Sequence, residues 1–108
     1  EADEAAAAAA LRHDIYARLP PTVAAGAMEA DRHVTLGSAH FLQGNFDLAL
    51  GCFARALELR RHALGRAHAL TAATESDCGI AADLAGLPEC AEPHHRAALE
   101  ARQALFGI

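Results

Sequence analysis

The stretch "GNFDLALGCFARALELRRHALG" at residues 44–65 decides the expected fold, because it recurs as "GLPECAEPHHRAALEARQALFG" at residues 86–107. The two copies are offset by 42 residues, which indicates an internal repeat. Nine positions between residues 39 and 65 are identical in the second copy. They are Ala39, Leu42, Gly44, Ala49, Ala56, Leu57, Glu58, Arg60 and Gly65. Because the glycines recur along with the alanines, the match reflects a repeated structural unit and not only a shared excess of alanine.

The spacing of apolar residues predicts that the repeated unit is helical. Apolar side chains recur every three or four residues, and no long stretch alternates with a period of two. Prolines and glycines mark the expected ends of the helices. The expected helices run from about Asp3 to Leu19, from about Met28 to Gln43, from Phe46 or Asp47 to just before Gly65, from about Leu70 to Ala85, and from Pro88 to Gly107. We therefore expect an all-α chain.

Each copy has the pattern of a helical hairpin. The first reads His33-x-x-Leu36-Gly37-x-x-His40, then Gly44, Phe46, Ala49-x-x-x-Phe53 and Ala56. Small residues let two helices approach closely, and we expect Leu36, Phe46 and Phe53 to fill the space between them. The second copy has the same spacing with smaller or more polar packing residues. It reads Glu75-x-x-Cys78-Gly79-x-x-Ala82, Gly86, Ala91-x-x-x-His95 and Ala98.

This hairpin pattern resembles the tetratricopeptide repeat, with histidines in positions where that family usually has Trp and Tyr. The 42-residue period resembles the repeat of kinesin light chains, as do the segments Ala91-Glu92-Pro93 and Gly65-Arg66-Ala67-His68, although Ala69 replaces the usual proline. The resemblance extends over about residues 28–107. It implies a right-handed α-solenoid of antiparallel helical hairpins with two to two and a half repeats.

The resemblance also divides the chain. Residues 28–65 form the first repeat and residues 66–108 the second. Residues 1–27 form an alanine-rich helix followed by a proline-containing linker. This helix also fits the second half of a degenerate preceding repeat, because Leu11 lies 42 residues before Phe53.

Two repeats leave apolar surface uncovered, because stacked hairpins bury their core between neighbours and about three repeats are normally needed. We therefore expect the chain to be a segment of a longer array, or to be completed by a partner. On this expectation, Leu99 and Leu105 of the last helix are exposed.

Composition excludes several classes of function. The chain has 29 alanines, no lysine and a net charge of −5, so a phosphate-binding surface for nucleic acid is not expected. No apolar run is long enough to span a membrane. Three cysteines without C-x-x-C spacing argue against a disulfide scaffold and for a reducing, cytoplasmic compartment. Similarity to kinesin light chains adds a cytoskeletal association to this expectation.

Cys90, His94 and His95 resemble a metal site at first, since Cys90 and His94 are four residues apart on an expected helix. The repeat offers a simpler interpretation, in which His95 takes the packing position of Phe53. His68 is expected to form a local hydrogen bond in a turn. Motifs of nucleophilic, zinc-protease, phosphate-binding and dinucleotide-binding sites are absent from the sequence. We therefore expect no catalytic residue, no metal and no cofactor.

The expected function is a protein–protein interaction scaffold that binds a peptide or partner protein with some basic residues on its concave face. By the resemblance, this face presents Asp31, Val34, Ser38, Phe41, Ala73, Ser76, Ile80 and Asp83. The chain lacks the asparagines and the lysine that relatives use there to hold a peptide. Three alternatives remain: a solvated face without a ligand, an architectural element of a large cytoskeletal or motor-associated assembly, and a sensor array attached to a catalytic domain.

Overall fold

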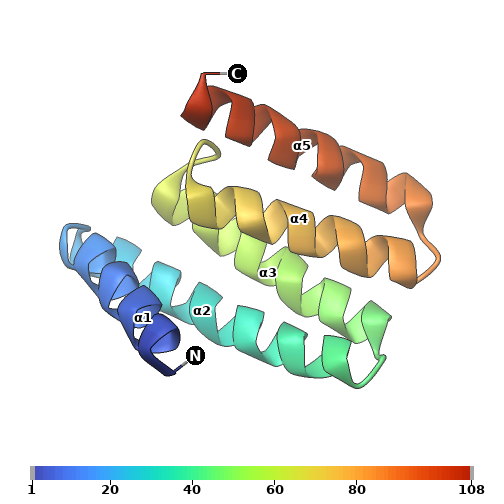
Figure 1. Ribbon diagram of the computed structural model, residues 1–108, viewed down its shortest axis with the longest axis horizontal. Coiled ribbons are helices and arrows are strands. Elements are labelled where there is room, and N and C mark those ends of the chain that lie inside the picture. Colours follow the sequence, from blue (N-terminus) through green and yellow to red (C-terminus); the bar gives the residue numbers. More distant parts are fainter. Residues whose placement is uncertain (1, 108) are drawn as a thin grey trace.

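The computed structural model describes residues 2–107, and this part of the chain folds into helices joined by short turns (Figure 1). The helices are α1 (Ala2–Ala17), α2 (Pro21–Leu42), α3 (Phe46–Leu64), α4 (Ala69–Leu84) and α5 (Pro88–Phe106). No strand occurs within residues 2–107. The expectation of an all-α solenoid of antiparallel hairpins with about two repeats is confirmed.

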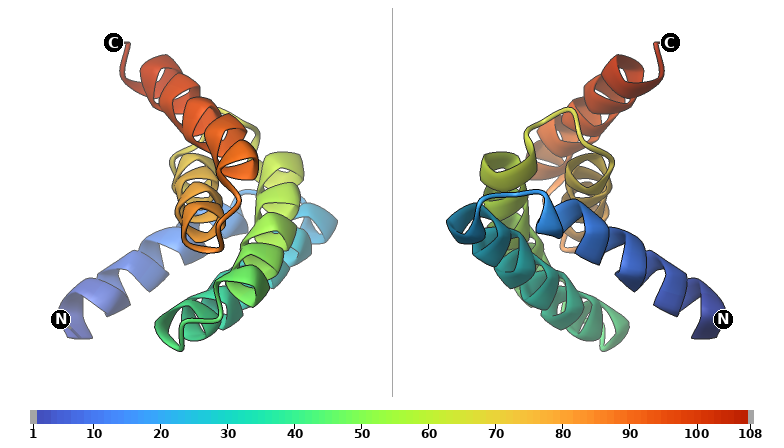
Figure 2. Two further views of the ribbon diagram at one scale, coloured as in Figure 1. Left: turned by 90° about the vertical axis from the view of Figure 1, so that its right-hand side faces the viewer. Right: turned by 90° about the vertical axis from the view of Figure 1, so that its left-hand side faces the viewer.

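Two hairpins stack on each other. α2 packs along α3 in the first hairpin, α4 packs along α5 in the second, and α3 joins the hairpins by packing against α4. α1 makes much less contact with α2 than the paired helices make with each other. Figure 2 shows that α1 and α2 meet near their connecting turn and then diverge like the arms of a V. The stacked part of the molecule therefore consists of α2 to α5.

The two hairpin turns share one geometry, as the repeat predicts. Gly44 and Gly86 both adopt positive φ angles, 80° and 79°, which glycine tolerates without steric cost. The next residue donates its N–H to the carbonyl five residues earlier: Asn45 to His40 at 2.9 Å, and Leu87 to Ala82 at 2.8 Å. This bond satisfies a carbonyl at the end of the first helix of each hairpin.

The connection between the hairpins is closed by His68. The backbone N–H of Leu70 donates to His68 Nδ1 at 3.1 Å, so the imidazole caps α4. Burial and the nearby Arg60 guanidinium lower the pKa of His68, which keeps the ring neutral and able to accept this bond. The predicted local role of His68 is confirmed.

Helix boundaries differ from the prediction mainly at the start of α2. The sequence suggested a linker up to residue 27 and a helix from Met28, but α2 begins at Pro21. Proline is favoured in the first turn of a helix, where its missing N–H would have no partner. α1 ends at Ala17, two residues before the expected end, and Pro20 restricts the backbone just before it.

The core lies where α2, α3 and α4 meet. Its buried residues are Ala49, Phe53, Leu57, Cys78 and Ala81, and Val34, Phe41 and Leu50 pack against them. Gly37 lets α2 approach α3, because a Cβ atom there would lie 2.8 Å from the Phe53 ring. Gly79 has the same relation to His95 in the second hairpin, so the prediction that His95 takes the Phe53 position is confirmed.

One predicted core residue lies on the surface. Leu36 is 51% exposed, whereas Cys78, its equivalent 42 residues later, is fully buried. The reason is that α3 covers this face of α4, while α1 diverges from the same face of α2. Leu11 of α1 is likewise 63% exposed, although its equivalent Phe53 is in the core. α1 therefore does not pack on the first hairpin as α3 packs on the second.

Leu99 and Leu105 of α5 are 57% and 39% exposed, as predicted. Within residues 2–107, no helix is both long and apolar enough to cross a bilayer.

Candidate partner-binding groove

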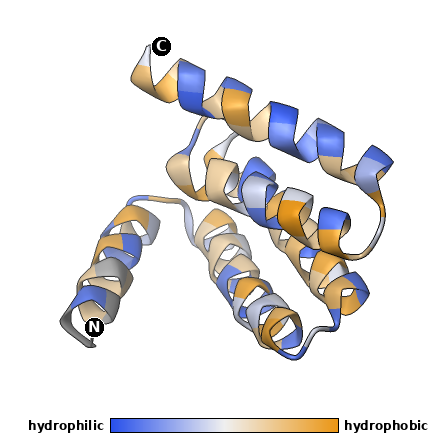
Figure 3. Ribbon diagram, turned by 45° about the vertical axis from the view of Figure 1, so that its right-hand side comes forward, coloured by the Kyte–Doolittle hydropathy of each residue, from blue (hydrophilic) through white to orange (hydrophobic). Residues whose placement is uncertain are grey.

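A groove runs between α2 and α4, the first helices of the two hairpins. It encloses a cavity of about 340 Å³ whose lining is mostly apolar. The residues that line it are Ser38, Phe41 and Leu42 of α2, Phe53 of α3, and Asp77 and Ile80 of α4. Figure 3 shows hydrophobic residues on α4 and at the ends of α2 and α3 next to their connecting turn, which is where this groove lies.

The ring of Phe41 forms part of one wall of the groove. Phe41 meets Phe46 edge to face, with ring centroids 5.2 Å apart and an interplanar angle of 71°. Phe41 also packs against the core, so its ring is held from behind while one side remains accessible. The floor is made by Phe53, which Gly37 allows to approach α2 closely. The groove is therefore preformed by the packing of the first hairpin.

Asp77 gives this apolar groove a negative charge. The carboxylates of Asp31, Glu75 and Asp83 each pair with a basic or imidazole side chain. Asp77 has no ion pair within the part of the chain that the structure describes. Burial raises the pKa of Asp77, although the more distant Arg60 guanidinium opposes the shift. An ionised carboxylate beside apolar walls attracts a cation that can reach it from the groove.

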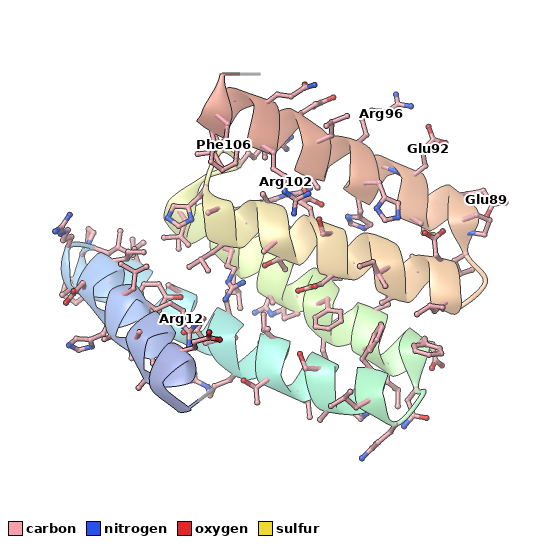
Figure 4. The ribbon with its side chains drawn as sticks, in the orientation of Figure 1. Arg12, Glu89, Glu92, Arg96, Arg102 and Phe106 are labelled. Atoms are coloured by element: carbon pink, nitrogen blue, oxygen red, sulfur yellow. The ribbon has the colours of Figure 1, made fainter. Side chains whose placement is uncertain are left out.

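A larger hollow of about 420 Å³ lies between α1 and α2, but its charges are already paired. Asp31 Oδ1 accepts a hydrogen bond of 2.9 Å from the Tyr16 hydroxyl and another of 2.9 Å from Arg60 Nη2. Arg12 Nε lies 3.9 Å from Asp31 Oδ2, and Figure 4 shows Arg12 on the side of α1 that faces α2. Burial and the bond to Asp31 raise the pKa of Tyr16 to about 12. This cluster ties α1 to the first hairpin.

The residues predicted for the concave face have different surroundings. Ser38, Phe41 and Ile80 line the cavity between α2 and α4, and Ala73 is exposed on α4. The other four already contact residues of this chain. Val34 packs against the core, Asp31 accepts from Tyr16 and Arg60, Ser76 accepts from Arg102 at 2.9 Å, and Asp83 lies 2.9 Å from His95. Whether these eight residues bind a partner stays a prediction.

Sequence reasoning missed Leu42, Phe53 and Asp77 as groove residues. Helical spacing was the signal for two of them, since Leu42 follows Ser38 by four residues and Asp77 follows Ala73 by four. Phe53 belongs to α3 and reaches the groove only because Gly37 leaves a gap in α2. That contribution depends on how the two helices pack, which their spacing alone does not specify.

The two adjacent histidines of α5 are engaged in contacts between helices. His94 Nδ1 lies 2.8 Å from Glu75 Oε1, and His95 Nε2 lies 2.9 Å from Asp83 Oδ2, so both rings tie α5 to α4. Cys90 is an exposed free thiol. Across residues 2–107, no group of three or more His, Cys, Asp or Glu side chains is placed to hold a metal ion. The packing interpretation of these residues thus agrees with their contacts.

Comparison with known protein families gives a match that covers most of the chain. The family model described as "Tetratricopeptide repeat" matches residues 29–104. This range begins in α2 and ends in α5, so it includes both hairpins and the groove between them. Searches of curated proteins and of solved structures found no match.

Proposed function

The chain belongs to the tetratricopeptide repeat family, and on that premise we propose that it binds a peptide segment of a partner protein in the groove between α2 and α4. Members of this family generally mediate protein–protein interactions and are typically not catalysts. The observation that supports this groove in particular is the apolar cavity in which residues of both hairpins meet around Asp77.

The chemistry of the groove supports a proposal about the partner segment. Its walls favour an apolar side chain, which gains about 25 cal/mol for each Å² of surface that it buries. The carboxylate of Asp77, which forms no ion pair with any residue that the structure describes, favours an arginine or lysine next to that side chain. A net charge of −5 attracts a cationic segment over longer range. We therefore propose a segment in which apolar and basic residues alternate or lie one helical turn apart.

Binding such a cation would relieve a cost in the folded protein. Because the pKa of Asp77 is raised by folding, the folded chain holds this proton more tightly than the unfolded chain does. Ionisation of Asp77 therefore lowers the stability of the folded chain as the pH rises from the pKa of Asp77 in the unfolded chain through its raised pKa in the folded chain. The ionised form of the carboxylate is partly desolvated in the folded protein, and a cation of the partner would compensate for the lost solvation.

Peptides that differ only in charge test the proposal. The probes are two short fluorescein-labelled peptides, one alternating leucine with arginine and one alternating leucine with glutamate, and binding is followed by fluorescence anisotropy. We expect the arginine peptide to bind at least about tenfold more tightly, which corresponds to about 1.4 kcal/mol. Higher salt should reduce this preference, because the charges near the groove are partly exposed.

Three variants locate the binding site. Asp77→Asn should remove most of the preference for the arginine peptide, and Ile80→Ser should weaken the binding of both peptides. Leu48→Ser is the matched control, since Leu48 is also exposed but lies on α3 outside the groove. Equal binding of the two peptides, or unchanged binding by both groove variants, would contradict the proposal. Asp77→Asn should also raise the melting temperature at neutral pH, which separates lost binding from lost folding.

The 42-residue period supports the further proposal that the repeat is of the kinesin-light-chain-like type. Three free thiols fit the proposed reducing compartment. An architectural role in a larger assembly is the second candidate, because α5 exposes large apolar residues away from the groove.

A further inference from the structure

α1 lies against the side of α2 that faces the groove. On α2, the hollow between these two helices is lined by Ala24, Met28 and Asp31. Asp31 corresponds to Ala73 one repeat later, and Ala73 is exposed on α4, one turn before the groove residue Asp77. The residues that α1 approaches therefore belong to the same side of the molecule as the groove.

A helix stacked as α3 is stacked on α4 would cover a different side of α2. On α4, the side next to α3 includes Thr74 and Cys78, and both are buried. Their equivalents on α2 are Arg32 and Leu36, and both are exposed. Arg32 is rotated by about 100° around the helix axis from Asp31, the residue that α1 contacts. α1 is therefore displaced from the stacking position towards the groove.

Few side chains hold α1 in this position. Among the side chains of α1 that the structure describes, only Tyr16 is buried. Its hydroxyl donates to Asp31 Oδ1 at 2.9 Å, and Arg12 Nε lies 3.9 Å from Asp31 Oδ2. The hollow of about 420 Å³ remains open beside these contacts. A helix with so little buried apolar surface can detach at a small cost in free energy.

The contact with α1 and the groove are two parts of one face of α2. Asp31, Ser38 and Leu42 are separated by seven and four residues, so they lie on the same face of the helix. Ser38 and Leu42 line the groove, and Asp31 lies about 10 Å from Ser38 along the helix axis, at 1.5 Å per residue. Because Leu42 ends α2, a segment longer than the groove gains further contacts with this face only towards Asp31, where α1 already lies.

We propose that α1 is an autoinhibitory arm, which a partner segment must displace when the segment extends beyond the groove towards Asp31. This inference rests on the proposed binding of a basic segment between α2 and α4. α1 already presents the chemistry proposed for the partner, since the Arg12 guanidinium lies at Asp31 beside apolar side chains. The arm and the partner therefore compete for one carboxylate, and the arm lowers the apparent affinity for long segments in proportion to the fraction of molecules in which it is seated.

The test compares two peptides of alternating leucine and arginine that differ in length. Four residues span about 13 Å when extended and ten residues about 33 Å, so only the longer peptide reaches Asp31 from the groove. Tyr16 is the only tyrosine, so the full chain with ¹³C-labelled tyrosine gives an NMR ring signal that reports on α1 alone. We expect the ten-residue peptide to move this signal to the position that it has in the urea-unfolded chain. The four-residue peptide should bind without moving it.

Two variants weaken the arm and leave the groove residues unchanged. Tyr16→Phe removes the hydrogen bond to Asp31, and Arg12→Gln removes the charge beside it. Each should raise the affinity for the ten-residue peptide about two- to tenfold, as expected when the competing arm loses one hydrogen bond or charge contact. Neither should change the affinity for the four-residue peptide. Arg18→Gln is the matched control for Arg12→Gln, because it removes the same charge from an exposed residue just beyond α1.

The outcomes separate this inference from the groove proposal. If the ten-residue peptide bound while the Tyr16 signal stayed in place, or if neither arm variant raised its affinity above the control, α1 would not be inhibitory and the groove proposal would stand. If neither peptide bound to any of these proteins, the groove proposal would be wrong and this inference with it. A variant in which α1 alone loses its helix, as seen by circular dichroism, still gives a valid test, because the arm is then detached.

Discussion

Replacing glycine by alanine inside a helix measures how closely the helices approach each other. Alanine gains about 1 kcal/mol of helix propensity over glycine when its methyl group has space. Gly26 and Gly51 have no other atom within 4 Å of the added Cβ, so Gly26→Ala and Gly51→Ala should stabilise the protein by about 0.5–1 kcal/mol. These two substitutions supply the internal reference for the closely packed positions.

Gly37→Ala should be destabilising in spite of the same propensity gain. The new Cβ would lie 2.8 Å from two atoms of the Phe53 ring and 3.1 Å from Cys52 Cβ. Phe53 is 4% exposed and packed in the core, so it cannot rotate away. Overpacking of this kind costs about 1–3 kcal/mol or more. After the propensity gain, we expect a net loss of about 1–2 kcal/mol, or about 4–8 °C in melting temperature.

Gly79→Ala is the equivalent change in the second hairpin and should be nearly neutral. Its Cβ would meet the His95 ring even more closely, at 2.5 Å. The His95 side chain is 45% exposed, however, and only its contact with Asp83 holds it in place. Rotation of the His95 ring into solvent would break its exposed contact with Asp83, which contributes at most about 1 kcal/mol. The gain in helix propensity offsets this loss.

Thermal and urea denaturation followed by circular dichroism would rank these variants. The expected order of stability is Gly26→Ala and Gly51→Ala above the unchanged protein, Gly79→Ala close to it, and Gly37→Ala below it. If Gly37→Ala were as stable as Gly51→Ala, the close packing of α2 on Phe53 would be wrong. If Gly79→Ala lost as much as Gly37→Ala, the freedom of His95 to move would be refuted instead.

Other predictions concern the buried polar groups. Arg60→Leu should lower the free energy of unfolding by about 2–3 kcal/mol, because it leaves buried hydrogen-bond acceptors unsatisfied. Arg102→Leu leaves no buried acceptor unsatisfied and should lower it by less than about 0.5 kcal/mol. Equal losses in urea denaturation would disprove this difference. Tyr16 is the only tyrosine, so tyrosinate absorbance should titrate near pH 12 in the folded chain. Asp31→Asn should lower this midpoint only in part, because burial is the larger cause of the raised pKa; an unchanged midpoint would exclude the bond to Asp31. Since the neutral phenol is favoured by folding, its contribution to stability should be intact below pH 10 and be lost between pH 10 and 12. Burial, with the neighbouring Glu75 carboxylate, raises the pKa of Cys78 to about 12. A thiol reagent should therefore modify Cys78 only after unfolding, and rapid reaction of all thiols in the native protein would contradict the burial of Cys78.

The repeat made much of the fold predictable from the sequence. Identical glycines 42 residues apart located both hairpin turns, and Pro88 marked the start of α5. Local patterns of this kind suffice because helix ends depend mainly on the residues next to them. The one large boundary error, at Pro21, arose because a pair of prolines both ends one helix and is allowed to begin another.

The candidate groove was predictable only in part. The resemblance to the tetratricopeptide repeat placed Ser38, Phe41 and Ile80 on the expected concave face, and these three residues do line one cavity. Spacing did not reveal that Phe53 reaches the same cavity from α3, since that contact requires the gap left by Gly37. Nor did it distinguish Asp77, which has no ion pair among the described residues, from acidic residues whose charge is already compensated.

By itself, the sequence determined the helices, their turns and the faces on which side chains lie, because these follow from periodicity and local backbone preferences. Only the tertiary structure decided which of those faces are covered. Leu36 and Cys78 hold the same position in their hairpins, yet α3 buries Cys78, whereas α1 leaves Leu36 exposed. Asp31 was expected to meet a partner but instead accepts bonds from Tyr16 and Arg60, which are 15 and 29 residues away. Such contacts depend on how separate helices pack, and residue spacing within one helix carries no information about that.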